Sequence, residues 1–253
     1  MKPASTHPVA TPINERTNEK TMNYGIIVAA GKSERMGPSV DKAFLSLGNK
    51  PVLAYSLLAF EHCPLIDGVI LVVRKDRLDG ARSMAQMYGC NKVKKVVAGG
   101  SQRQASVING LSALDDEISL GEEVRVIAIH DGARPCVTVE LIAETIQSAK
   151  RYGSGVAAVK VTDTIKSVDR GVNVDKTLDR SKLWAAQTPQ AFKYDLLTKA
   201  YEGVQKKKLI ITDDASAVEL TKGDVRLVPA GQTNIKITTP DDLALAATLL
   251  GVG

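Results

Sequence analysis

Residues 25–42 read GIIVAAGKSERMGPSVDK, and this stretch joins a short apolar strand to a turn and two cations. The run at 26–28 is β-branched and apolar, as in strands that are buried on both faces of a sheet. Arg35 and Lys42 follow the turn, where they can neutralise the charge of a bound anion. Small side chains in the turn let backbone N–H groups approach phosphate oxygens closely, so we predict a nucleotide site at Ala29, Ala30 and Gly31.

Two common phosphate-binding loops do not fit this stretch. Residues 31–33 (GKS) resemble the end of a P-loop, but Ile26 stands where that loop needs its first glycine. The dinucleotide fingerprint fails because Ser33 and Met36 occupy its second and third glycine positions. An ordinary strand-to-helix turn with solvated cations stays open as an alternative from these residues alone.

The motif A-A-G-x-x-x-R-M followed by a lysine resembles the signature loop of nucleotidyltransferases that activate sugar phosphates, and residues 29–36 with Lys42 carry it. Within that class the sequence is most similar to the 2-C-methyl-D-erythritol 4-phosphate cytidylyltransferase family of the non-mevalonate isoprenoid pathway. Ser33 departs from the glycine that many members have there and should reduce the flexibility of the turn. The resemblance spans residues 24–250. It implies that CTP is bound and that the catalytic residues are Arg35, Lys42 and Lys236.

The composition is ordinary for a soluble globular protein, with 44% hydrophobic and 24% charged residues, and a length of 253 residues allows one α/β domain or two small ones. No apolar run approaches the roughly 20 residues of a membrane-spanning helix, so we expect no membrane contact. A formal charge of +5 suits anionic small molecules, whereas 4% aromatic residues argue against stacking on nucleic acid. Three cysteines and three histidines are dispersed, which indicates neither disulfides nor a zinc site and favours the cytoplasm.

Residues 1–23 contain three prolines and little aliphatic periodicity, so we predict a disordered tail there and a single domain at 24–253. Apolar runs at 69–73 and 93–98 follow the first strand and alternate with helical patterns. This order predicts an α/β fold with a doubly wound, mostly parallel sheet, Rossmann-like as in nucleotidyltransferases. Ligands of such sheets bind beyond the carboxyl ends of the strands.

A glycine-rich turn, GGSQRQASV at 99–107, follows the third predicted strand. It resembles the base-recognition segment of the family, in which glycines would let backbone groups reach a flat pyrimidine. The resemblance implies that the nucleotide is bound by Gly99, Gly100, Ser101 and Ser106. A turn in which Ser101 caps the next helix is equally compatible with these residues.

The apolar run at 124–129 ends in HDGARP at 130–135. We predict that Asp131, at the end of a central strand, points into the nucleotide crevice. Its carboxylate suits Mg²⁺, which also binds substrate phosphates. The planar guanidinium of Arg134 can bind another phosphate through two N–H groups. A structural Asp–Arg pair in a loop is the alternative, although this hexapeptide is among the more specific matches to the family.

Residues 162–183 change in character, with short apolar runs, a turn at 169–171 and many Lys and Asp residues. They resemble a projecting β-arm, and such a hairpin is marginal in water unless it packs on something. In the family the arm embraces a second subunit, so the resemblance implies a homodimer with shared active sites. Thr164 and Arg180 match positions that bind the acceptor, although both could equally be solvated hairpin residues.

The C-terminal part is expected to contain a helix from residue 191 to about 205, a helix N-cap at Thr212, and strands at 225–228 and 234–237. Thr239 is expected to cap the final helix. By resemblance, further acceptor-binding positions are Thr188, Thr212 and Lys236.

The chemistry implied by the resemblance is transfer of CMP from CTP to 2-C-methyl-D-erythritol 4-phosphate, with release of pyrophosphate. Such a reaction needs no general base, because the attacking phosphate is already anionic and the residues must only hold two anions in line. A ribitol-5-phosphate cytidylyltransferase is the nearest alternative, and a non-catalytic nucleotide-binding protein is a further one. Four residues argue against the latter, because binding alone would tolerate their loss: Arg35, Lys42, Asp131 and Lys236.

Overall fold

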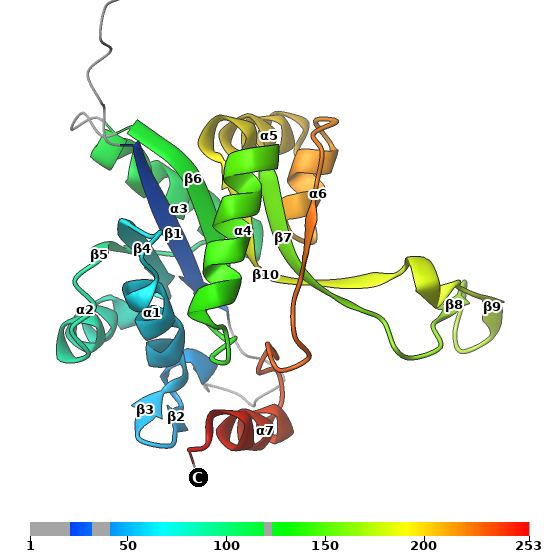
Figure 1. The fold of residues 1–253 in the computed structure, drawn as a ribbon, viewed down its shortest axis with the longest axis horizontal. Coiled ribbons are helices and arrows are strands. Elements are labelled where there is room, and N and C mark those ends of the chain that lie inside the picture. The colour runs from blue at the N-terminus through cyan, green and yellow to red at the C-terminus, as the bar shows by residue number, and fades with distance from the viewer. Residues whose placement is uncertain (1–20, 32–40, 119–122, 253) are drawn as a thin grey trace, which may run out of the picture.

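A seven-stranded sheet forms the centre of the protein (Figure 1). The computed structural model describes residues 21–31, 41–118 and 123–252, so Arg35 and most of the predicted tail lie outside the described residues. The strands of the sheet are β1 (Thr21–Ala29), β4 (Gly68–Val73), β5 (Val93–Ala98), β6 (Glu123–Asp131), β7 (Ser154–Lys160), β10 (Trp184–Lys193) and β11 (Leu227–Pro229). Their order is β11-β7-β10-β6-β1-β4-β5.

The sheet is mostly parallel, as the sequence predicts. β1 pairs in parallel with β4 and β6, β4 with β5, and β7 with β11. β10 is the exception, because it runs antiparallel between β6 and β7. The prediction of a helix from residue 191 is therefore wrong at its start. Ala191 and Phe192 are fully buried strand residues, and the helix begins at Tyr194.

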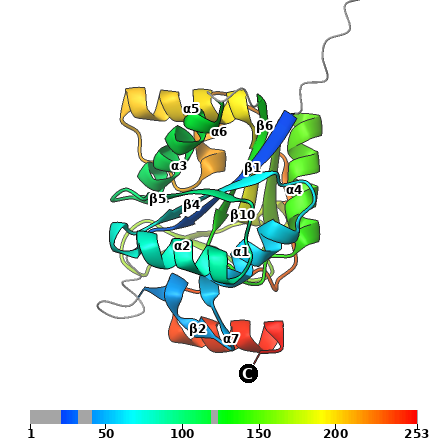
Figure 2. The ribbon, with the colours of Figure 1, turned by 90° about the vertical axis from the view of Figure 1, so that its left-hand side faces the viewer.

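Helices cover both faces of the sheet, which gives the three layers of a doubly wound fold (Figure 2). They are α1 (Val52–His62), α2 (Leu78–Met87), α3 (Arg103–Ile118), α4 (Val139–Tyr152), α5 (Tyr194–Lys207) and α6 (Asp214–Glu219). Alternate residues of β1 face opposite layers, because Ile27 packs with α1, α2 and α4, and Ile26 with α3, α5 and α6. Among the described residues, none of the helices combines the length and apolar character needed to cross a bilayer.

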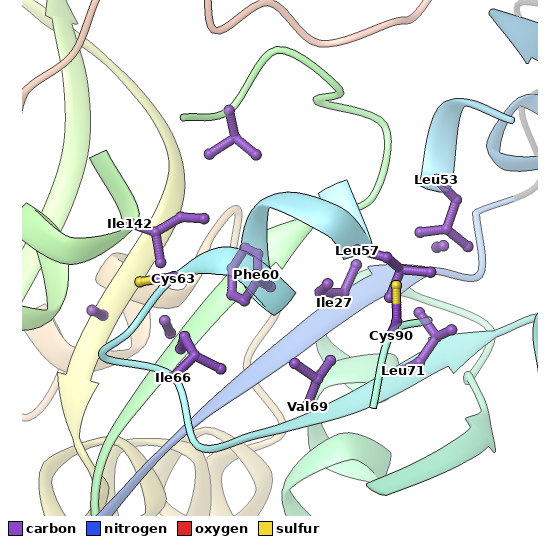
Figure 3. Packing of buried hydrophobic residues seen from close by; sticks show 14 of the residues in the cluster. Ile27, Leu53, Leu57, Phe60, Cys63, Ile66, Val69, Leu71, Cys90 and Ile142 are labelled. Carbon is purple, nitrogen blue, oxygen red and sulfur yellow. The ribbon is translucent and has the colours of Figure 1, made fainter. Parts of the chain in front are cut away.

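The larger core cluster lies between the sheet and α1, and Figure 3 shows Leu57 and Phe60 of α1 beside Ile27 of β1. Phe60 is fully buried, which contributes about 2–3 kcal/mol to folding. Its ring occupies the space that Gly25 leaves open, since a Cβ at Gly25 would lie 2.6 Å from the ring. This close approach sets α1 against the middle of β1.

The last helix, α7 (Pro240–Leu250), closes the lower end of the molecule in Figure 1 beside the hairpin of β2 (Ser46–Leu47) and β3 (Lys50–Pro51). Thr239 is the N-cap, as predicted, and forms a capping box with Asp242. The cap fixes the backbone directly after the loop that carries one of the predicted catalytic lysines.

The segment predicted as a β-arm, 162–183, contains a separate antiparallel pair of strands, β8 (Lys166–Val168) and β9 (Val174–Thr177), and the short helix η4 (Arg180–Lys182). The two strands lie far to the right of the central sheet in Figure 1. Three apolar side chains are exposed on them and in their turn, namely Val168, Val172 and Val174. Contact of this segment with a second subunit stays a prediction.

Three further sequence predictions are wrong in detail. β1 begins at Thr21, so residues 21–23 belong to the strand and not to a tail, because they pair with β6. Residues 234–237 form no strand in the described structure and instead make a loop. The cap of α6 is Asp213 and not Thr212, because the Asp213 carboxylate accepts the N–H of Ser216 at 3.0 Å.

Candidate active site

A cavity of about 680 Å³ opens at the carboxyl ends of β1, β4, β5 and β6. This is the edge of the sheet at which the sequence predicts a nucleotide. Its described walls include the turns after β1 and β5 and the end of β6. The predicted site residues that line it are Ala29, Ala30, Gly31, Lys42, Gly99, Gly100, Ser101, Ser106, Asp131 and Lys236.

The turns after β1 and β5 touch each other at Gly99. A Cβ at this position would lie 2.3 Å from the Cβ of Ala30, so a larger residue would have to move one wall of the cavity. Ser106 holds the same turn, because its hydroxyl accepts the N–H of Gly100 and donates to the carbonyl of Gln102, both at 3.1 Å. The Ser106 hydroxyl thus has protein partners, and its bond to a base stays a prediction.

Asp131 ends β6, and its carboxylate is shared by two cations. Arg103 Nε donates to Oδ1 at 3.0 Å, and Lys236 Nζ donates to Oδ2 at 2.5 Å. Burial alone would raise the pKa of Asp131, but Arg103 and Lys236 hold this pKa well below its ordinary value. The carboxylate is therefore ionised near neutral pH. The stability that the Asp131 carboxylate contributes is fully present above the pKa of the unfolded chain. It is lost only as the pH falls through the lower pKa of the folded protein.

The loop before α7 carries Lys236 and also supports Lys42 at the cavity. Two hydrogen bonds fasten it to the residues after β6, from Arg134 Nη1 to the Asn234 carbonyl at 2.7 Å and from the Ile237 N–H to the Ala133 carbonyl at 2.8 Å. Lys42 Nζ donates to the carbonyl of Ile237 at 2.9 Å. The ammonium groups of Lys42 and Lys236 are therefore supported by the same short piece of backbone.

Lys42 begins a short 3-10 helix, η2 (Lys42–Phe44), which is capped by Asp41. Asp41 Oδ1 accepts the N–H of Ala43 at 3.2 Å, and Oδ2 lies 3.3 Å from Arg77 Nε without hydrogen-bond alignment. The Arg77 guanidinium also lies over the ring of Phe44, 5.2 Å from its centroid. These contacts attach the turn that carries Lys42 to the connection between β4 and α2.

His130 is fully buried beside Asp131 and is a neutral structural residue. Thr188 Oγ1 accepts the N–H of Asp131 at 3.0 Å and lies 3.1 Å from His130 Nδ1. The hydroxyl proton can then point at Nδ1, which assigns the ring proton to Nε2, 3.3 Å from the carbonyl of Arg134. Burial, with Arg134 and Arg103 nearby, lowers the pKa of His130 to about 3. Since both ring nitrogens have partners, His130 is not placed to act as a general base.

Acidification from pH 7 to pH 5 is expected to lower the free energy of unfolding by about 2 kcal/mol through His130 alone. The unfolded chain binds a proton at this side chain near pH 6.5 while the folded protein keeps it neutral, so lower pH favours unfolding. His130→Gln should lose this part of the pH dependence, and His62→Gln, at an exposed position, should keep it. Urea unfolding at both pH values measures the difference, and an unchanged pH dependence in His130→Gln would contradict it.

Five predicted acceptor-binding residues are not among the described residues that line the cavity: Arg134, Thr164, Arg180, Thr188 and Thr212. Thr188 contacts the site indirectly, through the backbone of Asp131. Thr164 and Arg180 are exposed in the segment 162–183, where Arg180 donates to the carbonyl of Thr162 at 2.6 Å. Thr212 is also exposed. Contact of these side chains with a substrate stays a prediction.

Sequence reasoning gave no role to Arg103 or Asp214. Arg103 lines the cavity, and its Nη2 donates to Asp214 Oδ2 at 2.7 Å while its Nε holds Asp131. Arg103 lies in the glycine-rich segment 99–107, and Asp214 lies two residues after the predicted N-cap Thr212, so both are close to residues that the sequence singles out. No spacing rule joins them, because the pairing arises only when α3 and α6 meet at the end of β6.

Asp131 has the donor chemistry for Mg²⁺, because its carboxylate is ionised and lines the cavity. Within the described part of the chain, no group of three or more His, Cys, Asp or Glu side chains is arranged to hold a metal ion. One protein carboxylate is compatible with Mg²⁺, which keeps several waters and takes other ligands from substrate phosphates. The residues present therefore fit a magnesium ion that arrives with a nucleotide.

Solved structures define the class of this protein. The crystal structure of 4-diphosphocytidyl-2C-methyl-D-erythritol synthase from Anaerococcus prevotii superimposes with a TM-score of 0.78 and 31% sequence identity, over 91% of this chain and 96% of that chain. The central sheet, with the cavity at its carboxyl edge, is therefore that of an α/β nucleotidyltransferase.

Sequence comparison then identifies the family. The family model described as "IspD: 2-C-methyl-D-erythritol 4-phosphate cytidylyltransferase" matches residues 24–252. The cytidylyltransferase of that name from Clostridium acetobutylicum is 41% identical over 230 residues, which cover 90% of this chain and 97% of that protein. The one from Dehalococcoides mccartyi is 43% identical over 236 residues, which cover 93% and 98%. The chain belongs to the 2-C-methyl-D-erythritol 4-phosphate cytidylyltransferase family.

Proposed function

We propose that this protein transfers the cytidylyl group of CTP to 2-C-methyl-D-erythritol 4-phosphate, in the non-mevalonate route to isoprenoids. The observation that carries the proposal is a cavity, in a member of this family, that joins a glycine-rich turn, two lysines and an ionised aspartate. A phosphate oxygen of the acceptor attacks the α-phosphorus of CTP. The bond from that phosphorus to the bridging oxygen of the β-phosphate breaks, and pyrophosphate leaves.

The side chains of the cavity act on charge and orientation in this reaction. We assign Lys42 to the charge that develops on the α-phosphate and Lys236 to the acceptor phosphate. The resemblance gives Arg35, which lies outside the described residues, the same role as Lys42. The turn at 99–106 binds the cytosine. Asp131 would hold Mg²⁺. When bound, this ion would neutralise negative charge on the triphosphate and on the leaving pyrophosphate. A neutral His130 with both ring nitrogens occupied accords with a reaction that needs no general base.

We also propose a homodimer in which the segment 162–183 of each subunit reaches the active site of the other. Support comes from the exposed valines of this segment and from Thr164 and Arg180, which are exposed within their own chain. Together with Arg134, Thr188 and Thr212, they would complete the acceptor site. Light scattering should give twice the 27.0 kDa mass of one chain, and the mass of a single chain would contradict the dimer.

We place the reaction in the cytoplasm. All three cysteines of the chain, Cys63, Cys90 and Cys136, are buried free thiols, as expected of a reducing compartment. CTP and an acceptor phosphate are the partners, and neither nucleic acid nor a membrane is required.

The proposal is tested by pyrophosphate release with CTP and Mg²⁺, with 2-C-methyl-D-erythritol 4-phosphate and ribitol 5-phosphate offered in separate reactions. We expect turnover with the erythritol phosphate. Turnover with ribitol phosphate alone would keep the reaction class and replace the acceptor. No turnover with either, together with CTP binding in a calorimeter, would favour the non-catalytic nucleotide-binding protein.

A further inference from the structure

A line of bonded polar side chains runs from the cavity into the interior of the protein. From the cavity inward its members are Lys236, Asp131, Arg103, Asp214 and Tyr201. At the inner end, Arg103 Nη2 donates to Asp214 Oδ2 at 2.7 Å, and the Tyr201 hydroxyl donates to Asp214 Oδ1 at 2.5 Å. Asp214 is fully buried and Tyr201 is 2% exposed, so this end is closed to solvent.

Arg103 bridges two carboxylates through different nitrogens of one guanidinium. Nε holds Asp131 at 3.0 Å and Nη2 holds Asp214. The guanidinium is planar and rigid, so it keeps a fixed direction between its two partners, which a flexible lysine ammonium does not. Because Arg103 begins α3 and Asp214 begins α6, the bridge ties two helices to the end of β6.

Asp214 has a role other than direct contact with a ligand, because it is not among the described residues that line the cavity. A buried carboxylate is costly unless it is paired, and here each oxygen has a partner. Arg103 does line the cavity, so an anionic nucleotide would attract its guanidinium away from Asp131. The buried Asp214 opposes that movement from behind.

We propose that Arg103 is a positioning residue, which Asp214 and Tyr201 anchor and which fixes the carboxylate of Asp131 at the cavity wall. The inference rests on the proposed function, in which Asp131 binds Mg²⁺ together with the nucleotide. While Arg103 holds Oδ1, Oδ2 keeps its place beside Lys236 and is the oxygen available to exchange partners when substrates bind. A direct contact between Arg103 and the nucleotide is the competing role, and the following experiment separates the two.

Arg103→Lys keeps the positive charge but cannot bridge both carboxylates as a rigid fork. The kcat should fall by about 10- to 100-fold, as is usual when the support of a metal ligand is removed. The Kd of CTP, measured by calorimetry in EDTA, should change by less than about twofold because the charge is kept. The gain in CTP affinity on adding Mg²⁺ should shrink, and this measures the support of Asp131 without any turnover.

Tyr201→Phe removes only the innermost hydrogen bond of the anchor, from the Tyr201 hydroxyl to Asp214, and keeps the buried ring. The kcat should fall by about fivefold, since one bond to a charged group is lost. Tyr194→Phe is the matched control, because Tyr194 lies on the same helix and donates to Asp115 at 3.0 Å, in the described structure outside the cavity. That variant should keep the unmodified kcat, and melting temperatures show whether each variant is folded.

The proposal would be overturned if Arg103→Lys had the kcat of the unmodified protein and the same gain in CTP affinity on adding Mg²⁺. A loss of CTP affinity in EDTA above about tenfold, with kcat retained, would do the same, because Arg103 would then be a nucleotide ligand. Equal kcat values in Tyr201→Phe and Tyr194→Phe would show that Tyr201 does not anchor Arg103. If the unmodified protein turns over neither acceptor, the proposed function fails. The gain in CTP affinity on adding Mg²⁺, compared between the unmodified protein and Arg103→Lys, still decides the role of Arg103.

Discussion

Lys42→Ala is expected to lower kcat by about 10²–10³-fold, equivalent to about 3 kcal/mol of transition-state stabilisation. Lys42 lines the cavity, and its Nζ is held 2.9 Å from the carbonyl of Ile237, so the ammonium is in place before the substrates arrive. A cation positioned in advance stabilises developing charge without reorganisation. The loss should fall on kcat more than on KM, because the interaction strengthens in the transition state. Steady-state rates of pyrophosphate release measure both.

Lys199→Ala is the matched control, because Lys199 is exposed on α5 and, in the described structure, lies outside the cavity. Lys42→Arg keeps the charge with a longer, planar group and should recover only part of the rate. The melting temperature of Lys42→Ala should stay close to that of the unmodified chain, since Asp41 caps the turn through the backbone of Ala43. If the kcat of Lys42→Ala is within about threefold of the unmodified value, Lys42 does not stabilise the transition state.

The parts of the site that depend on neighbouring residues could be predicted from the sequence. An apolar run followed by small residues at 29–31 predicts a buried strand and a turn that a ligand can approach closely, and the structure places these residues at the cavity wall. The apolar run at 124–129 predicts a buried strand that ends close to Asp131. Because parallel strands end at a common edge of the sheet, Asp131 is expected near the turn that follows β1. Thr239 with Pro240 predicts the start of α7. Each of these features is set by strand burial or helix capping within a few residues.

The support behind the site could not be predicted, because it depends on residues that meet only in the folded chain. Arg103, Asp131 and Asp214 come from the starts of two helices and the end of a strand. β10 was missed for a related reason. Its sequence, WAAQTPQAFK, contains Gln and Pro and has little strand propensity, and only its position between β6 and β7 makes it a strand.

Asp131→Asn is expected to lower kcat by at least about 10²-fold while CTP binds as tightly as before, or more tightly, in the absence of Mg²⁺. The amide has nearly the shape of the carboxylate, so the cavity keeps its form but loses a charge and a metal ligand. Arg103 keeps its bond to Asp214, while Lys236 loses its partner. Removing one negative charge from the wall reduces repulsion of a polyanionic nucleotide.

The two effects of Asp131→Asn have opposite signs, and this separates the possible roles of the carboxylate. If Asp131 acts through a metal ion, turnover and the Mg²⁺ gain in CTP affinity are lost together, while binding in EDTA is preserved. If it only holds the neighbouring cations in place, binding of CTP in EDTA should weaken, because Lys236 loses its carboxylate partner and moves. Asp195→Asn, at an exposed position on α5, makes the same change of charge outside the described cavity and should leave both measurements unaltered. Calorimetry with and without Mg²⁺, beside steady-state rates, distinguishes these outcomes in one set of proteins.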